Sequence, residues 1–159
     1  EVRCWSEAEW ERVIDEEQAL SNGALSLDST GAFASLVTRV ISMQAADCDA
    51  LGQARAESAW WPDADDDRRD LAWALGVLAH EAQHVAGVRD EAETECRGQQ
   101  RLADVAVALG APRSQARRLA ELSWSELYPE LDEEYTTDLC VDGGPFDLRP
   151  GRAAGWPWG

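Results

Sequence analysis

A chain of 159 residues with a formal net charge of −17 is long enough for one hydrophobic core, but it repels phosphate backbones and anionic lipid surfaces. We therefore expect a single domain over residues 1–159 and do not expect nucleic acid as a partner. The hydrophobic fraction of 45% is typical of a globular protein, and no apolar run reaches the roughly 18 residues of a membrane-spanning helix.

The N-terminal part of the chain predicts a helix, a hairpin and a second helix. Ser6 and Glu9 form a capping box, which predicts a helix over residues 7–20. Two short apolar runs separated by turn residues, 24–27 and 32–37, predict a small β-hairpin. The second helix is expected over residues 38–52.

The remainder of the chain predicts three further helices, over residues 68–86, 91–109 and 113–128. Gly87 and Gly110 fit the ends of the first two, and Pro112 fits the start of the third. Residues 141–159 are rich in Gly, Pro and Trp and predict an irregular tail. The predicted fold class is therefore α+β and mainly helical, with a small β-hairpin or sheet.

Four cysteines are spread along the chain without a CxxC pair, namely Cys4, Cys48, Cys96 and Cys140. An even number at wide spacing favours two disulfides, formed in an oxidising compartment, over four reduced buried thiols. Three connectivities are possible, and Cys4–Cys48 with Cys96–Cys140 is a guess among them. The chain begins at Glu1 instead of Met, which we interpret as loss of an upstream signal or anchor. We therefore predict an extracellular protein, either secreted or the ectodomain of an anchored one.

The only two histidines lie four residues apart, in the sequence His80-Glu81-Ala82-Gln83-His84. Side chains at this spacing stack on one face of a helix, so two imidazoles can bind one metal ion. Glu81 then stands beside the ion, where it can take a proton from bound water. This HExxH pattern predicts a Zn²⁺ site with His80 and His84 as ligands and Glu81 as the general base.

The next helix supplies acidic partners for the two histidines. On a helical wheel His80 and His84 lie away from the main apolar stripe, on a face shared with Trp73. Glu91 and Glu95 extend the apolar stripe of the following helix, where a buried carboxylate requires a cationic partner. The short connection forces the helices to run antiparallel, so two imidazoles and two carboxylates should meet across one interface.

This helix pair resembles the gluzincin branch of zinc metallopeptidases over roughly residues 70–100. The resemblance implies a zincin-like domain in which His80, His84 and Glu91 hold Zn²⁺, with Glu95 in the place of an aspartate behind His80. It also implies hydrolysis of a peptide or protein substrate. Residues 80–100 additionally resemble secreted or anchored actinobacterial proteins of uncharacterised function.

The sequence departs from the gluzincin pattern in two respects. The interval from His84 to Glu91 is shorter than that family usually has, which leaves Glu95 as the alternative third ligand. Such peptidases also tend to stabilise the oxyanion with a downstream His or Tyr. No third histidine exists, so only Tyr128 or Tyr135 is available for this role.

A metzincin-like site is a second alternative, because residues 80–90 also spell HExxHxxGxxD and would make Asp90 the third ligand. That family needs a methionine turn after the motif, and the only methionine, Met43, lies before it. Asp90 is also explained as the N-cap of the following helix. Glu91 is therefore preferred to Asp90.

Taken together, these residues predict a zinc-dependent extracellular metallopeptidase. The alternative from another class is a non-catalytic, acidic extracellular interaction module with an inert or structural metal site. The purely structural interpretation is that His80 and His84 only form hydrogen bonds with Glu91 and Glu95.

Overall fold

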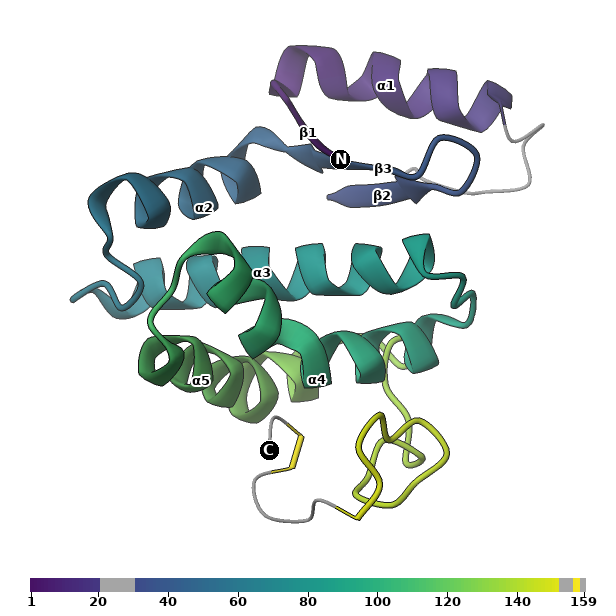
Figure 1. Cartoon of the computed structure of the whole chain (residues 1–159). Coiled ribbons are helices and arrows are strands. Elements are labelled where there is room, and N and C mark those ends of the chain that lie inside the picture. The colour runs from purple at the N-terminus through teal and green to yellow at the C-terminus, as the bar shows by residue number, and fades with distance from the viewer. Residues whose placement is uncertain (21–30, 152–155, 158–159) are drawn as a thin grey trace.

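Two long antiparallel helices, α3 (Asp65–Val85) and α4 (Glu91–Leu109), form the centre of the structure (Figure 1). It is a computed structural model that describes residues 1–20, 31–151 and 156–157. The fold class is α+β and mainly helical, as the sequence predicted. The other elements within these ranges are β1 (Val2–Trp5), α1 (Glu7–Leu20), β2 (Ala32–Ser35), β3 (Val40–Gln44), α2 (Ala45–Glu57), α5 (Arg113–Leu122), a π-helical turn (Ser123–Leu127) and a short 3-10 turn (Tyr128–Glu130).

Helix α3 lies between two layers, which explains why it carries apolar side chains on more than one face (Figure 1). On one side Leu78 packs in a cluster with Ile41 of the sheet. On the other side Leu75 packs in a larger core with Leu102 of α4 and Leu119 of α5. The helix that carries both histidines is therefore held from two directions.

Two of the predicted helices, over residues 7–20 and 91–109, are confirmed at both ends. Helix α4 begins after Asp90, whose side chain accepts a hydrogen bond from the backbone N–H of Glu93 at 2.9 Å. It ends at Gly110, which has a φ of 114°, a conformation that glycine adopts without a steric penalty. Clear capping residues therefore made this helix predictable.

The other two helices of the second half differ from their predicted bounds. Helix α3 begins at Asp65 instead of residue 68, because three consecutive aspartates suit the positive end of the helix dipole. The helix predicted over residues 113–128 is α-helical only to Leu122 and then widens into the π-helical turn that begins at Ser123.

The sheet is mixed and has the strand order β1–β3–β2. β1 pairs in parallel with β3, and β2 pairs antiparallel with β3. β2 lies within the strand expected over residues 32–37 and pairs with β3 along one edge, so the predicted pairing of its other edge stays a prediction. Residues 24–27, its expected partner, lie outside the described residues.

The helix predicted over residues 38–52 is wrong at its start, because α2 begins only at Ala45. The preceding residues form β3, in which Val40 and Ile41 are β-branched and therefore favour a strand. Burial of Met43 in the same cluster as Ile41 adds tertiary packing that a local helix pattern does not reveal.

Two disulfides are present, Cys4–Cys48 and Cys96–Cys140, which decides among the three possible connectivities. The first joins β1 to α2, and the second joins α4 to the segment that follows the 3-10 turn. Two disulfides are compatible with an extracellular location. Across the described ranges, no helix combines the length and the apolar character needed to cross a membrane.

The segment after the 3-10 turn contains no helix or strand in its described part, and Gln100 holds it against α4. The amide nitrogen of Gln100 donates to the carbonyl of Phe146 at 2.9 Å, and its carbonyl accepts from the N–H of Leu148 at 2.8 Å. These hydrogen bonds and the Cys96–Cys140 disulfide fix the segment to the side of the helix pair.

Candidate metal centre

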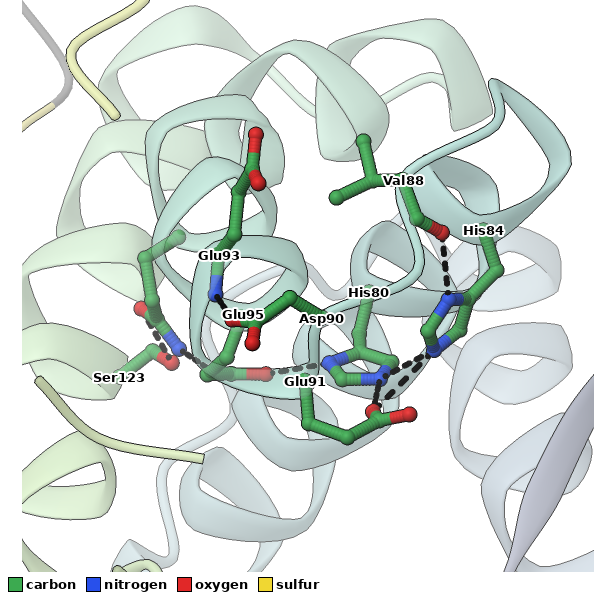
Figure 2. Close-up of polar contacts among 9 residues, drawn as sticks. His80, His84, Val88, Asp90, Glu91, Glu93, Glu95 and Ser123 are labelled. Carbon is green, nitrogen blue, oxygen red and sulfur yellow. Dashed lines mark hydrogen bonds and ion pairs between the residues drawn. The ribbon is translucent and has the colours of Figure 1, made fainter. Parts of the chain in front are cut away.

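A tight turn between α3 and α4 brings four ionisable residues to one place (Figure 2). His80 and His84 lie in the last two turns of α3, while Glu91 begins α4 and Glu95 lies one turn later. The connection turns at Gly87, which has a φ of 102°, a value that favours glycine. The two imidazoles and two carboxylates therefore meet at a single interface between the helices.

The two helices approach each other closely at this interface because α4 carries a glycine there. A Cβ atom placed on Gly98 would lie 3.1 Å from the backbone nitrogen of His80 and 3.2 Å from its Cα atom. Any larger residue would have to push the helices apart. Gly98 thus permits the spacing at which side chains from α3 and α4 reach one another.

Three electron-rich atoms converge at the centre of the group. The Nε2 atoms of His80 and His84 are 3.0 Å apart, and Oε2 of Glu91 lies 3.1 Å from the first and 3.2 Å from the second. Within the described part of the chain, His80, His84 and Glu91 are the group whose side chains lie close enough together to hold a metal ion.

The second nitrogen of each imidazole already has a partner. Nδ1 of His84 lies 2.9 Å from the carbonyl oxygen of Val88, and Nδ1 of His80 lies 2.8 Å from Oε2 of Glu95. Carbonyl and carboxylate oxygens accept hydrogen bonds, so each Nδ1 carries the proton. In neutral imidazoles both Nε2 lone pairs then point towards Glu91, and such a cluster requires a cation, either a proton or a metal ion.

The pKa values of the cluster reflect its affinity for positive charge. Burial opposes a charge on His80, but hydrogen bonds to Glu91 and Glu95 outweigh it and raise the pKa of His80 to about 10. The hydrogen bonds from His80 and His84 lower the pKa of Glu91 to about 2. In the absence of metal, the histidine pair therefore holds a proton that a metal ion must displace.

Glu81 lies beside the cluster and is only 7% exposed. Its Oε2 atom is buried without a hydrogen-bond partner among the described residues, although the backbone N–H of Ala34 on β2 donates to the carboxylate. Burial raises the pKa of Glu81, and the nearby His80 and His84 act in the opposite direction. A buried carboxylate oxygen without a partner leaves room for the hydrogen bond of a bound molecule.

The alternative third ligands occupy other positions. Glu95 contacts Nδ1 of His80, on the opposite edge of the ring from Nε2, and it is buried there. Asp90 accepts the N–H of Glu93 and caps α4. Neither belongs to the group that could hold a metal ion. This arrangement favours Glu91 as the carboxylate ligand and Glu95 as the group that orients His80.

The two tyrosines that the sequence could not place differ in their relation to the centre. The ring of Tyr135 lies 5.8 Å from the ring of His80, measured between centroids. Tyr128 instead stacks on Trp124 at 4.6 Å, and its hydroxyl oxygen accepts from the N–H of Thr137. Tyr135 therefore borders the candidate site directly, on the segment fixed to α4 by the second disulfide.

The expectation that Trp73 lines the histidine face is wrong. Trp73 lies two turns before His80, is 46% exposed, and lines a separate cavity of about 620 Å³ between α2 and the start of α3. A helical wheel gives the direction of a side chain but not its height along the axis. Trp61 also lines this cavity, together with the acidic residues Asp47, Asp49, Glu57, Asp63, Asp67 and Asp70.

Two contacts of the centre were missed in the sequence. Gln99 donates to Oε1 of Glu95 at 2.7 Å. It lies four residues after Glu95, so a helical wheel places the two side chains on one face of α4. Ala34 contacts Glu81 through its backbone, which leaves no trace in the side-chain pattern.

Comparison of the chain with protein-family models, with curated proteins and with solved structures finds no match. The fold and site define an α+β protein with a candidate His/His/Glu metal centre between two helices. Its function is therefore argued from the residues of the site.

Proposed function

We propose that the protein is an extracellular zinc-dependent peptidase in which His80, His84 and Glu91 hold the ion. The convergence of two Nε2 atoms and one carboxylate oxygen within 3.0–3.2 Å carries the proposal. Two neutral imidazoles and one carboxylate form a donor set that suits Zn²⁺ and leaves a coordination position open. The two disulfides support the extracellular location.

Each residue of the centre has a separate task in this proposal. Bound Zn²⁺ would supply a Lewis acid that polarises the substrate carbonyl and makes a water molecule more acidic. Glu81 accepts the proton of that water and passes it to the leaving amine, a role that suits a carboxylate whose pKa is raised by burial. Glu95 holds His80 in the tautomer with the proton on Nδ1.

A non-catalytic acidic interaction module with an inert or structural metal is the second candidate. It is favoured by the acidic lining of the cavity of about 620 Å³ between α2 and the start of α3, which lies apart from the metal centre. The net charge of −17 suits a cationic partner for such a module.

Metal analysis and one substitution distinguish the two candidates. Protein purified without a histidine tag should contain close to one equivalent of zinc. Glu81→Gln should retain the metal and lose cleavage of a broad peptide library, because the amide cannot accept the proton. The control is Glu93→Gln, since Glu93 is partly buried on the same helix α4 and pairs with Arg97 instead of with the histidines. Zinc without cleavage in the wild type supports the interaction module, and absence of zinc contradicts both candidates.

A further inference from the structure

A chain of buried hydrogen bonds leads from the candidate metal centre to the π-helical turn. Oε2 of Glu95 lies 2.8 Å from Nδ1 of His80, and its Oε1 accepts from the amide nitrogen of Gln99 at 2.7 Å. The carbonyl of Gln99 in turn accepts from the hydroxyl of Ser123 at 3.0 Å. All four side chains are buried. Figure 2 shows the chain from Ser123 to His80.

The chemistry of the four groups fixes the direction of every hydrogen bond. The carboxylate of Glu95 only accepts, so the amide of Gln99 must present its nitrogen to it and its carbonyl to Ser123. The second oxygen of Glu95 then accepts the proton on Nδ1 of His80. This leaves Nε2 of His80 free to point at the metal position, on the side of Glu91.

The chain of hydrogen bonds ends at Ser123, where the polypeptide backbone has an unusual conformation. The α-helix stops at Leu122, and a π-helical turn begins at Ser123. Such turns are rare and occur often at functional sites. On the facing helix α3, a Cβ atom placed on Gly76 would lie 3.8 Å from Oγ of Ser123, so the hydroxyl sits close against α3. The turn therefore inserts Ser123 into the helix interface.

We infer that Gln99 and Ser123 are positioning residues that tune zinc affinity by holding Glu95 against His80. The inference rests on the proposed zinc centre and extends it, because neither residue reaches the metal position. A carboxylate fixed by a second hydrogen bond keeps the imidazole oriented and raises its basicity as a ligand. Without Gln99, Oε1 of Glu95 loses its buried donor, and the carboxylate can rotate away from His80.

Gln99→Leu and Gln100→Leu form a matched pair for testing this role. The two residues are adjacent on α4 and both are buried. Each substitution removes the hydrogen bonds of one amide, to Glu95 in the case of Gln99 and to Phe146 in the case of Gln100. Gln100 contacts the segment after the 3-10 turn instead of the metal centre. Zinc affinity is measured by competition with a chelator, using Zn²⁺ alone as the probe. The thermal midpoint of each metal-free variant shows how much stability it has lost.

We expect Gln99→Leu to weaken zinc binding about 10-fold, at the lower end of the range for residues behind a ligand. Ser123→Ala should weaken zinc binding by a smaller factor. Gln100→Leu should leave zinc affinity unchanged, even if it lowers the thermal midpoint as much as Gln99→Leu does. Ser123→Ala also serves if Gln99→Leu fails to fold. A second readout is the Nδ1–H signal of the His80 ring in the ¹⁵N spectrum of zinc-loaded protein, in which loss of Gln99 should increase exchange of this proton with water.

The outcomes separate this inference from the proposed function. Unchanged zinc affinity and unchanged exchange of the Nδ1–H of His80 in folded Gln99→Leu overturn the positioning role while leaving the zinc centre intact. Equal weakening by Gln100→Leu overturns it as well, since a general loss of stability then explains the effect. Wild-type protein that binds no zinc overturns the proposed centre and the inference together.

Discussion

Oε2 of Glu91 and Nε2 of His80 lie 3.1 Å apart, although the two residues are 11 positions apart and belong to different helices. Their contact requires the turn between α3 and α4, the cap that starts α4 and the close approach of the helices at Gly98. The candidate centre is thus a property of the helix pair, and the residues on both sides of it can be tested separately.

The two carboxylates of α4 should differ sharply in their effect on metal binding. Glu91→Ala removes a ligand in the proposed site, so it should weaken zinc binding by more than the roughly 100-fold upper range for residues behind a ligand. Glu95→Ala should fall within that range of roughly 10-fold to 100-fold. Chelator competition measures both. A strong loss of zinc affinity in Glu95→Ala but not in Glu91→Ala would identify Glu95 as the third ligand.

The stability of the metal-free protein should depend on pH through the same cluster. The pKa of His80 is raised from 6.5 to about 10, so its contribution is complete below pH 6.5 and is lost as the pH rises through 10. The pKa of Glu91 is lowered from 4.5 to about 2, so its contribution is complete above pH 4.5 and is lost as the pH falls through 2. Both contributions are present together between pH 4.5 and 6.5.

Urea unfolding in a metal chelator can measure this dependence, with Glu91→Gln as the comparison. The difference in unfolding free energy between wild type and variant should be largest near pH 5.5 and should shrink towards pH 10. A difference that is constant from pH 5.5 to 10 would show that the histidine–glutamate contacts do not form in the metal-free protein.

Gly98→Ala should destabilise the protein and weaken zinc binding. Its new Cβ would lie 3.1 Å from the backbone nitrogen of His80, so the helices must separate, at a cost of about 1–3 kcal/mol. Gly52→Ala in α2 is the control, because its Cβ meets nothing within 4 Å and it should stabilise the helix by about 0.5–1 kcal/mol. Chemical unfolding and chelator competition on both variants check the two effects. Equal behaviour of the two would contradict close packing at His80.

Removal of the Cys96–Cys140 disulfide should lower stability without removing the metal ligands. The bridge joins residues 44 positions apart, and loss of a bridge of this kind typically costs about 2–5 kcal/mol. We expect Cys96→Ala/Cys140→Ala to unfold at lower urea concentration and still bind zinc. Loss of zinc from a folded double variant would show that the segment carrying Tyr135 shapes the centre itself.

The parts of the molecule that the sequence predicted well depend on local rules. Asp90 and Gly110 mark both ends of α4, and the four-residue spacing of His80 and His84 depends only on the helical repeat. The facing position of Glu91 follows from the short connection between the helices. These features need no knowledge of distant parts of the chain.

The parts that the sequence missed depend on distant contacts. β1 pairs with β3, so Val2 is aligned with Ile41, and no short window of sequence contains both strands. Tyr135 reaches His80 because its segment is fixed to α4 by the Cys96–Cys140 disulfide. The π-helical turn at Ser123 likewise depends on packing against α3 and α4. No capping or helix-breaking residue in the sequence indicates where it begins.

The two disulfides enclose separate stretches of the chain, residues 4–48 and 96–140. A polypeptide that enters an oxidising compartment from its N-terminus exposes the first pair of thiols before Cys96 arrives. In such a compartment the first bridge can close without competition from the later cysteines, which would link β1 and α2 covalently before the histidine-bearing helix meets its partner. Oxidation can in this way proceed in order along the nascent chain, with no need for thiol reshuffling between its two halves.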